Sequence, residues 1–162
     1  MSLDSHFAEL EPELPPVPMS AGNYEPIVRA GNLLFVSGQF PIENGAFRYI
    51  GRVGAELSEA EGYAAARLAA LNVLAQIRAA LGTLEGLERL LRVEGHVASA
   101  PDWNNAPKVL DGASDLFVAA LGGRGRHTRT AFTPASLPFH LPVELVVTAL
   151  VKPDWTAQIA IP

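Results

Sequence analysis

Residues 129–151, RTAFTPASLPFHLPVELVVTALV, establish the strand pattern from which the fold can be worked out. The apolar run at residues 143–151 predicts a buried strand, and residues 129–133 predict another one before the turn around Pro138. Upstream, residues 90–100 (LLRVEGHVASA) alternate apolar and polar side chains. Period two over that length is typical of a half-buried strand. The second half of the chain is therefore expected to supply three strands.

The first half of the chain adds a strand and a hairpin. Leu33-Leu34-Phe35-Val36 is a short apolar run closed by Ser37-Gly38, which predicts a buried strand that ends in a loop. Asn44-Gly45 lies between two apolar segments. Both of these residues tolerate positive φ, so the pair predicts the turn of a β-hairpin.

Two helices are expected between the strands. Ser58 followed by Glu61 fits a capping box, an apolar stripe follows at spacings of three and four, and Gly82 is a plausible stop. Pro107 suits the first turn of the second helix, and Gly122-Gly123 ends it. The order hairpin, helix, strand, helix, two strands favours an α+β fold, with a mixed sheet and both helices packed on one face. The sheet is rich in Val, Leu and Phe, so we expect a homo-oligomer to bury its other face.

Composition excludes several classes of protein. With 162 residues, 49% hydrophobic and 18% charged, the chain is expected to form one folded domain. The absence of cysteine excludes disulfides, thiol nucleophiles and Cys-bearing zinc sites. The net charge of −5 argues against a nucleic-acid partner, which concentrated Lys and Arg would be needed to bind. The sequence shows no apolar run near 18 residues and no signal-peptide pattern at residues 1–10, so we expect a cytoplasmic protein with no membrane association.

The ends of the chain differ in composition from the middle. Residues 1–20 mix acidic residues with four prolines, which predicts an extended N-terminal arm with one short helical turn at residues 6–10. Residues 21–155 are expected to form the single domain, and residues 156–162 a C-terminal tail.

Two charged residues stand out as candidates for chemistry. Arg129 lies at the predicted start of a strand, where its planar guanidinium could hold a carboxylate or phosphate through two parallel hydrogen bonds. The alternative is a structural salt bridge or an exposed strand-end charge. Glu144 lies within a very apolar stretch, where burial could raise its pKa into the range for acid–base work. The alternative is an edge position, or a plain partner for Arg129.

Weaker candidates come from the first strand and from the histidines. The glycine of Ser37-Gly38-Gln39 would let the backbone approach a ligand closely, although a simple strand-ending turn fits as well. His96 lies two residues after Glu94, so both side chains share one strand face. No third ligand follows at a recognisable spacing, so we expect no metal. His127 and His140 are expected to be solvated loop residues.

Taken together, these motifs resemble the Rid family, also called YjgF-like, of reactive-intermediate (imine/enamine) deaminases. The resemblance runs from about Tyr24 to Lys152. Its most specific part is the succession of an arginine with an apolar strand (RTAF), Leu137-Pro138, and an apolar-Glu-apolar strand (VEL), together with the earlier Ser-Gly-Gln strand end. The resemblance implies a chorismate-mutase-like α+β fold that assembles as a homotrimer, with ligand clefts between neighbouring subunits.

The resemblance also implies a reaction. The family's substrates are 2-imino acids formed from dehydrated serine or threonine. Arg129 would clamp the substrate carboxylate, and Glu144 would activate a water and pass a proton as ammonia leaves. Tyr24 would close one wall of the cleft, while Ser37 and the backbone at Gly38 would give polar contacts. No metal or organic cofactor is implied, because an imine carbon is already electrophilic.

Two positions depart from the family pattern and leave alternatives open. Asp111 stands where many deaminating members carry Asn, and a negative charge there would weaken the binding of an anionic substrate. Ala131 replaces a small polar residue or Cys. The chain is therefore similar to a longer, less characterised branch of the family. The leading hypothesis is hydrolytic deamination of small 2-imino acids. The alternative is a non-catalytic, regulatory protein that binds a small carboxylate or metabolite. A third hypothesis, RNA cleavage, is opposed by the acidic balance of the chain.

Overall fold

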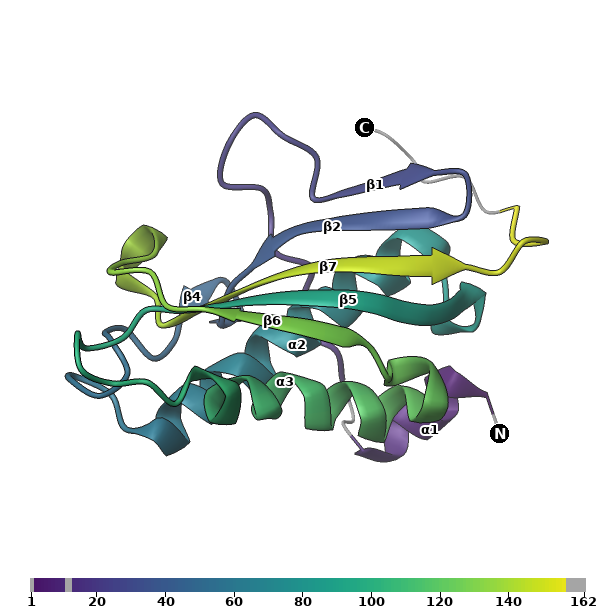
Figure 1. Cartoon of the computed structure of the whole chain (residues 1–162). Coiled ribbons are helices and arrows are strands. Elements are labelled where there is room, and N and C mark those ends of the chain that lie inside the picture. Colours follow the sequence, from purple (N-terminus) through teal and green to yellow (C-terminus); the bar gives the residue numbers. More distant parts are fainter. Residues whose placement is uncertain (1, 11–12, 157–162) are drawn as a thin grey trace.

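One five-stranded sheet organises the molecule in the computed structural model, which describes residues 2–10 and 13–156 (Figure 1). In chain order the elements are α1 (Leu3–Leu10), β1 (Ile27–Ala30), β2 (Leu33–Gln39), β3 (Ile42–Glu43), β4 (Ala46–Phe47), α2 (Glu59–Leu81), η1 (Leu84–Gly86), β5 (Leu87–Val97), α3 (Ala106–Leu121), η2 (Gly122–Gly125), β6 (Thr128–Phe132), η3 (Pro138–His140) and β7 (Val143–Val151).

The sheet has the strand order β1-β2-β7-β5-β6, in which only β5 and β6 run parallel. The turn at Asn44-Gly45 joins β3 and β4 into a separate small hairpin, as predicted. Both α2 and α3 pack on one face of the large sheet (Figure 1). The predicted α+β architecture is confirmed. Strand β1 was not predicted, although the Gly31-Asn32 pair that joins it to β2 is a recognisable turn signal.

The predicted helix boundaries follow from capping chemistry. The Ser58 side chain accepts a hydrogen bond from the Glu61 backbone, and the Glu61 carboxylate accepts one from the Ser58 backbone. Gly82 ends α2 with a φ of 78° in the left-handed region. By length and composition α2 is apolar enough to cross a membrane, but 67% of its most apolar window is buried inside the protein. We interpret α2 as the core helix of the domain.

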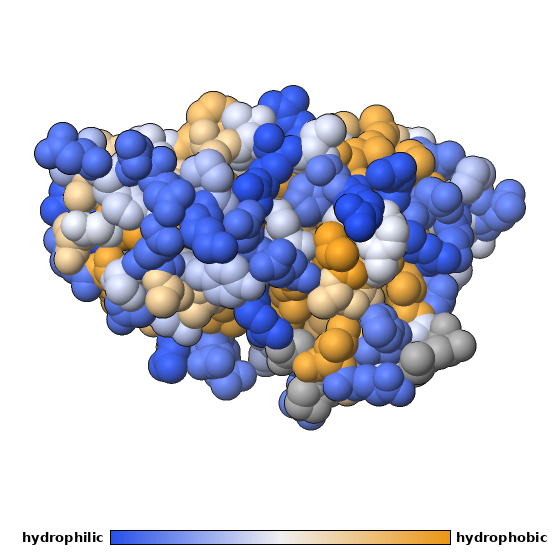
Figure 2. Space-filling view, turned by 60° about the horizontal axis from the view of Figure 1, so that its bottom comes forward, coloured by the Kyte–Doolittle hydropathy of each residue, from blue (hydrophilic) through white to orange (hydrophobic). Residues whose placement is uncertain are grey.

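Alternation along β7 separates the two faces of the sheet. Val143, Leu145 and Val147 belong to the fully buried core beneath the helices, whereas Glu144, Val146 and Thr148 point to the other face and are only partly buried. We call this second side the open face, because among the described residues no helix packs on it. It exposes Val28, Phe35 and Phe132 by 49%, 46% and 44%. The side of the molecule that carries α3 is mostly hydrophilic instead (Figure 2).

The N-terminal arm is more structured than the prediction of an extended segment with one helical turn. Helix α1 spans eight residues, and Phe7 inserts into the core with 4% exposure. The ring Nε2 of His6 lies 2.9 Å from the carbonyl oxygen of Ala119 in α3. Apolar burial therefore outweighs the weak helix propensity of so short a segment. Of the predicted C-terminal tail, residues 157–162 lie outside the described residues.

Candidate functional site

The six predicted site residues fall into two separate groups. Tyr24, Ser37, Gly38 and Glu144 lie near the end of β2 and the start of β7. Asp111 lies on α3 and Arg129 on the edge strand β6, and the two side chains pair with each other.

Glu144 lies on the open face, directly against Gly38. A Cβ atom at position 38 would collide with the Glu144 carboxylate, so glycine allows this side chain to lie where it does and any other residue would displace it. The neighbours Val143 and Leu145 are fully buried and anchor the strand in the core. Burial raises the pKa of Glu144 above its ordinary value, and the nearby His96 lowers it in part. Glu144 thus has the environment expected of a carboxyl that exchanges protons.

His96 is a neighbour of Glu144 that the sequence did not connect to it. The two residues are directly paired between β5 and β7. The His96 ring stacks on Phe132 with 5.0 Å between ring centroids, and its Nδ1 atom is buried with no hydrogen-bond partner among the described residues. Glu94, considered as a companion of His96, pairs with Arg92 at 2.8 Å instead. In the described part of the chain no group of three or more His, Asp or Glu side chains is placed to hold a metal ion.

The end of β2 carries the other two predicted contacts, Ser37 and Gly38. The register between β2 and β7 shifts between Val36 and Gln39, so the ladder is irregular at the two residues between them. The Ser37 hydroxyl donates a hydrogen bond to the carbonyl of Glu25 at 2.6 Å. Tyr24, the residue before Glu25, is therefore linked to this strand end.

Arg129 is held by the first half of α3. Its Nη1 donates to Asp111 Oδ1 at 3.1 Å and to Ser114 Oγ at 2.9 Å, and its Nη2 donates to the carbonyl of Pro107 at 3.1 Å. The salt bridge that was the alternative interpretation of Arg129 is thus present, with Asp111 as the partner instead of Glu144. These three bonds leave two of the five guanidinium N–H donors without a partner among the described residues.

His127 completes the support of Arg129. Its Nδ1 lies 2.6 Å from the Gly125 carbonyl, and its Nε2 lies 3.0 Å from Ser114 Oγ. A carbonyl can only accept, so Nδ1 carries the proton. Burial lowers the pKa of His127 and favours the neutral ring, whose Nε2 then accepts from the Ser114 hydroxyl. The expectation that His127 is solvated is wrong, because it is partly buried against Phe117.

Within one chain, Arg129 and Glu144 do not share a cleft. In the strand register, Arg129 lies beside the fully buried Val93, whereas Glu144 lies beside His96 on the open face. Side chains alternate between faces along a strand, so the two functional groups point to opposite sides of the sheet. The family resemblance assigned both residues to one substrate, but the sequence did not indicate that β5 lies between β6 and β7.

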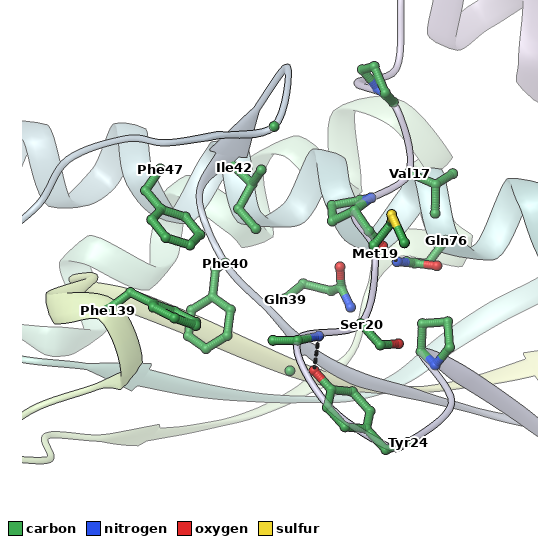
Figure 3. Close-up of a pocket in the computed structure, with 16 residues that line it drawn as sticks. Val17, Met19, Ser20, Tyr24, Gln39, Phe40, Ile42, Phe47, Gln76 and Phe139 are labelled. Atoms are coloured by element: carbon green, nitrogen blue, oxygen red, sulfur yellow. Dashed lines mark hydrogen bonds between the residues drawn. The ribbon is translucent and has the colours of Figure 1, made fainter.

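A pocket of about 440 Å³ opens beside Gly38 and was not predicted. The N-terminal arm, the end of β2, the β3–β4 hairpin and η3 surround it (Figure 3). Tyr24 lies at its edge, where its hydroxyl accepts a hydrogen bond from the backbone of Ala21 at 3.3 Å (Figure 3). One feature of the sequence could have indicated the pocket: the proline-rich arm carries two apolar residues, Val17 and Met19.

The mixed sheet carries both helices on one face and, on the other, a glutamate that packs against a glycine. This arrangement defines a chorismate-mutase-like α+β protein. The family model described as "YjgF/chorismate mutase-like, putative endoribonuclease" matches residues 4–150. The chain therefore belongs to this family, which confirms the resemblance seen in its sequence.

Individual relatives agree with this assignment. Protein TCP17 of Trypanosoma cruzi is 41% identical over 141 residues, covering 86% of this chain and 87% of that protein. A crystal structure of a "putative endoribonuclease" from Shewanella oneidensis is 38% identical with a TM-score of 0.89, and the match covers 93% of this chain and 99% of that one. A protein of unknown function from Agrobacterium tumefaciens is 40% identical with a TM-score of 0.84, covering 93% and 92%.

Proposed function

We propose that this protein hydrolyses small reactive 2-imino acids to 2-oxo acids and ammonia, in clefts between the subunits of a homotrimer. One observation carries the proposal: Glu144 holds a partly buried carboxyl of raised pKa on the open face, in space that a Cβ atom at position 38 would occupy. A structural role does not require a carboxylate there, since an apolar residue would be less costly to bury.

The reaction needs one water molecule and one proton relay. The Glu144 carboxylate takes a proton from water as the oxygen attacks the imine carbon. It then returns that proton to the imine nitrogen, which gives a carbinolamine. A second transfer through Glu144 moves the remaining proton from the carbinolamine hydroxyl to the amine nitrogen, so that the C–N bond breaks, the C=O bond forms and ammonia leaves. The net change is imine plus water to 2-oxo acid plus ammonia, with no redox step.

Arg129 supplies the carboxylate clamp in this proposal. Its two remaining N–H donors match the two oxygens of a carboxylate. Because Arg129 and Glu144 lie on opposite sides of one sheet, the clamp for a given Glu144 comes from the adjacent subunit. The exposed apolar residues of the open face favour such an assembly. A structural neighbour, Escherichia coli TdcF, was crystallised with bound serine and is 23% identical with a TM-score of 0.62. This supports a small amino-acid-like ligand.

The first experiment measures the loss of 2-iminopropanoate generated by an amino-acid oxidase. Wild-type protein is expected to accelerate hydrolysis, and Glu144→Gln to reduce the rate by about 100-fold or more, the usual scale of a lost general base. Glu88→Gln, a change at an exposed carboxylate of β5, is the matched control and should keep full activity. Equal rates with and without wild-type protein would contradict the proposal.

A second experiment tests whether the cleft is shared. Arg129→Ala and Glu144→Gln chains are each expected to be inactive as pure oligomers. Co-assembled in equal amounts, they should regain about a quarter of wild-type activity, because random mixing restores one in four Arg–Glu pairings across interfaces. If each pure variant is inactive and verified mixed oligomers show no recovery, the two groups must act from the same chain, which would contradict the shared cleft.

Binding without turnover is the second candidate function, and the Asp111–Arg129 ion pair favours it. That pair already neutralises the arginine, which reduces its attraction for an anionic substrate. A small carboxylate that raises Tm while no imine is hydrolysed would support the binding role. RNA should be included in the same series at low ionic strength, where we expect no cleavage because the chain carries a net charge of −5.

A further inference from the structure

We propose that the pocket beside Gly38 receives the side chain of the substrate, and that this side chain is aromatic or long and aliphatic. The inference rests on the proposed function and specifies its substrate class. It concerns a part of the molecule, the arm and the β3–β4 hairpin, that the reaction chemistry itself does not use.

Gly38 places the pocket next to Glu144. The same residue lines the pocket and lies directly against the Glu144 carboxylate. A 2-imino acid whose imine carbon is within reach of Glu144 can therefore direct its side chain past Gly38 into this pocket.

The walls of the pocket are apolar and wide enough for a ring. Apolar side chains converge from the arm, β2, β3–β4 and η3 (Figure 3), namely Val17, Met19, Phe40, Ile42, Phe47 and Phe139. The volume of about 440 Å³ lies within the usual range of small-molecule pockets. An apolar cavity of only about 150 Å³ is enough to bind benzene. A methyl group, the side chain of 2-iminopropanoate, would leave most of this space unfilled.

No charged side chain lines the pocket among the described residues. Its two glutamine side chains each donate one N–H within the chain, since Gln76 Nε2 donates to the Pro18 carbonyl and Gln39 Nε2 donates to the Ser37 carbonyl. A substrate side chain with a carboxylate or an ammonium would lose its hydration there without meeting an opposite charge. The pocket therefore selects an uncharged, apolar side chain.

Two exposed aromatic residues in the wall of the pocket favour a ligand-binding role. Phe47 and Phe139 stack with 4.7 Å between ring centroids although about half of each side chain is exposed. Phe139 has a φ of 59° and His140 a φ of 55°, in a region that residues with a Cβ rarely adopt. Such strain persists mainly where surrounding structure or function requires it. Filling the pocket with an apolar side chain would cover this stack.

The test compares stable 2-oxo acid products, because imines decay in water. By calorimetry, wild-type protein is expected to bind phenylpyruvate at least ten times more tightly than pyruvate. The double variant Phe47→Ala/Phe139→Ala should bind phenylpyruvate at least ten times more weakly than the wild-type protein does, which removes the preference. Both residues are exposed, so the variant should fold. Val118→Ala, at an exposed position on α3, is the matched control.

Turnover then separates this inference from the proposed function. Imines made by the oxidase from phenylalanine, leucine and alanine are expected to differ in kcat/KM by about tenfold in favour of the larger two. Hydrolysis of all three imines at equal efficiency, with equal affinity for the two oxo acids, would contradict the proposed role of the pocket. The proposal that the protein is a hydrolase would still hold. The opposite result is that phenylpyruvate binds preferentially, that the double variant loses this preference, and that no imine is hydrolysed. This result would support the proposed role of the pocket and contradict the proposed hydrolase function.

Discussion

Two glycines on the large sheet show how differently its faces are used. Gly95 of β5 points toward the helices, and a Cβ there would collide with the side chain of Leu110. Gly38 of β2 leaves the same kind of space, but the group that fills it is the carboxylate of Glu144. On the face covered by helices, the space left by a glycine is filled by an apolar side chain. On the open face, the space left by a glycine is filled by a titratable carboxylate.

The contrast extends over the whole sheet. The face covered by helices is closed, and its side chains on β7 are all apolar and essentially unexposed. The open face mixes exposed Phe and Val with Glu144 and His96. Packing is nearly complete within one chain on the first face. On the second face, one chain alone leaves both the apolar surface and the proposed site incomplete.

The largest expected difference is between adjacent residues of β2 that point to opposite faces. Leu34→Ala should lower the free energy of unfolding by about 2–5 kcal/mol, because Leu34 is fully buried in the core. Phe35→Ala should cost about 1 kcal/mol or less within the subunit but weaken the proposed trimer. Urea unfolding and light scattering after gel filtration measure the two effects. An unchanged mass for Phe35→Ala would indicate that this part of the open face is not an interface.

Gly38→Ala should reduce imine hydrolysis by about 100-fold, because the added methyl displaces the Glu144 carboxylate from its position. The steady-state rate with 2-iminopropanoate measures the effect. Gly123→Ala is the control, since a Cβ at that position meets no atom within 4 Å. Full activity in Gly38→Ala would show that the position of Glu144 does not matter to the reaction.

Asp111→Asn tests the arginine on the other side of the sheet. Removing the negative charge should strengthen the binding of a small carboxylate such as propanoate by a few-fold up to about tenfold, while stability changes by less than about 1 kcal/mol. Calorimetry gives the affinity. Asp115→Asn, which changes a carboxylate bonded to Tyr63, serves as the control. Weaker binding in Asp111→Asn would mean that Asp111 contributes to the site.

The smallest expected effect is on stability as a function of pH. Burial raises the pKa of Glu144 in the folded state, so its contribution to stability is full below the unfolded pKa and is lost as pH rises through the folded pKa. Glu144→Gln should therefore raise Tm by up to about 3 °C near pH 8 and leave it unchanged near pH 4.

Glu56 gives the opposite sign and is the internal comparison for that measurement. Hydrogen bonds from the Arg52 backbone and side chain lower the pKa of Glu56 to about 2. Its contribution is present above the unfolded pKa and is lost as pH falls toward about 2. Glu56→Gln should thus lower Tm slightly near pH 7 and have no effect at strongly acidic pH. The same sign for both variants would contradict the assignment of Glu144 to a desolvated site.

Local patterns predicted most of the fold for physical reasons that act within a few residues. The capping box of Ser58 and Glu61, the stop at Gly82 and the turn at Asn44-Gly45 depend on neighbouring backbone groups and appear as expected. Strand β1 and the full length of α1 were missed, because a short segment takes its structure from the surface on which it packs. Phe7 buries itself in a core made by distant parts of the chain.

The amino-acid sequence alone was enough to predict the α+β class and the family, and to single out Arg129 and Glu144. What these two residues face could be read only from the folded chain. Strand order puts β5 between β6 and β7, pairs His96 with Glu144, and directs Arg129 toward Asp111 on the opposite side of the sheet. Side-chain periodicity is a local property that the sequence carries. Which strands become neighbours depends on the apolar surface buried over the whole chain. The pocket beside Gly38 likewise forms from segments that are distant in the sequence.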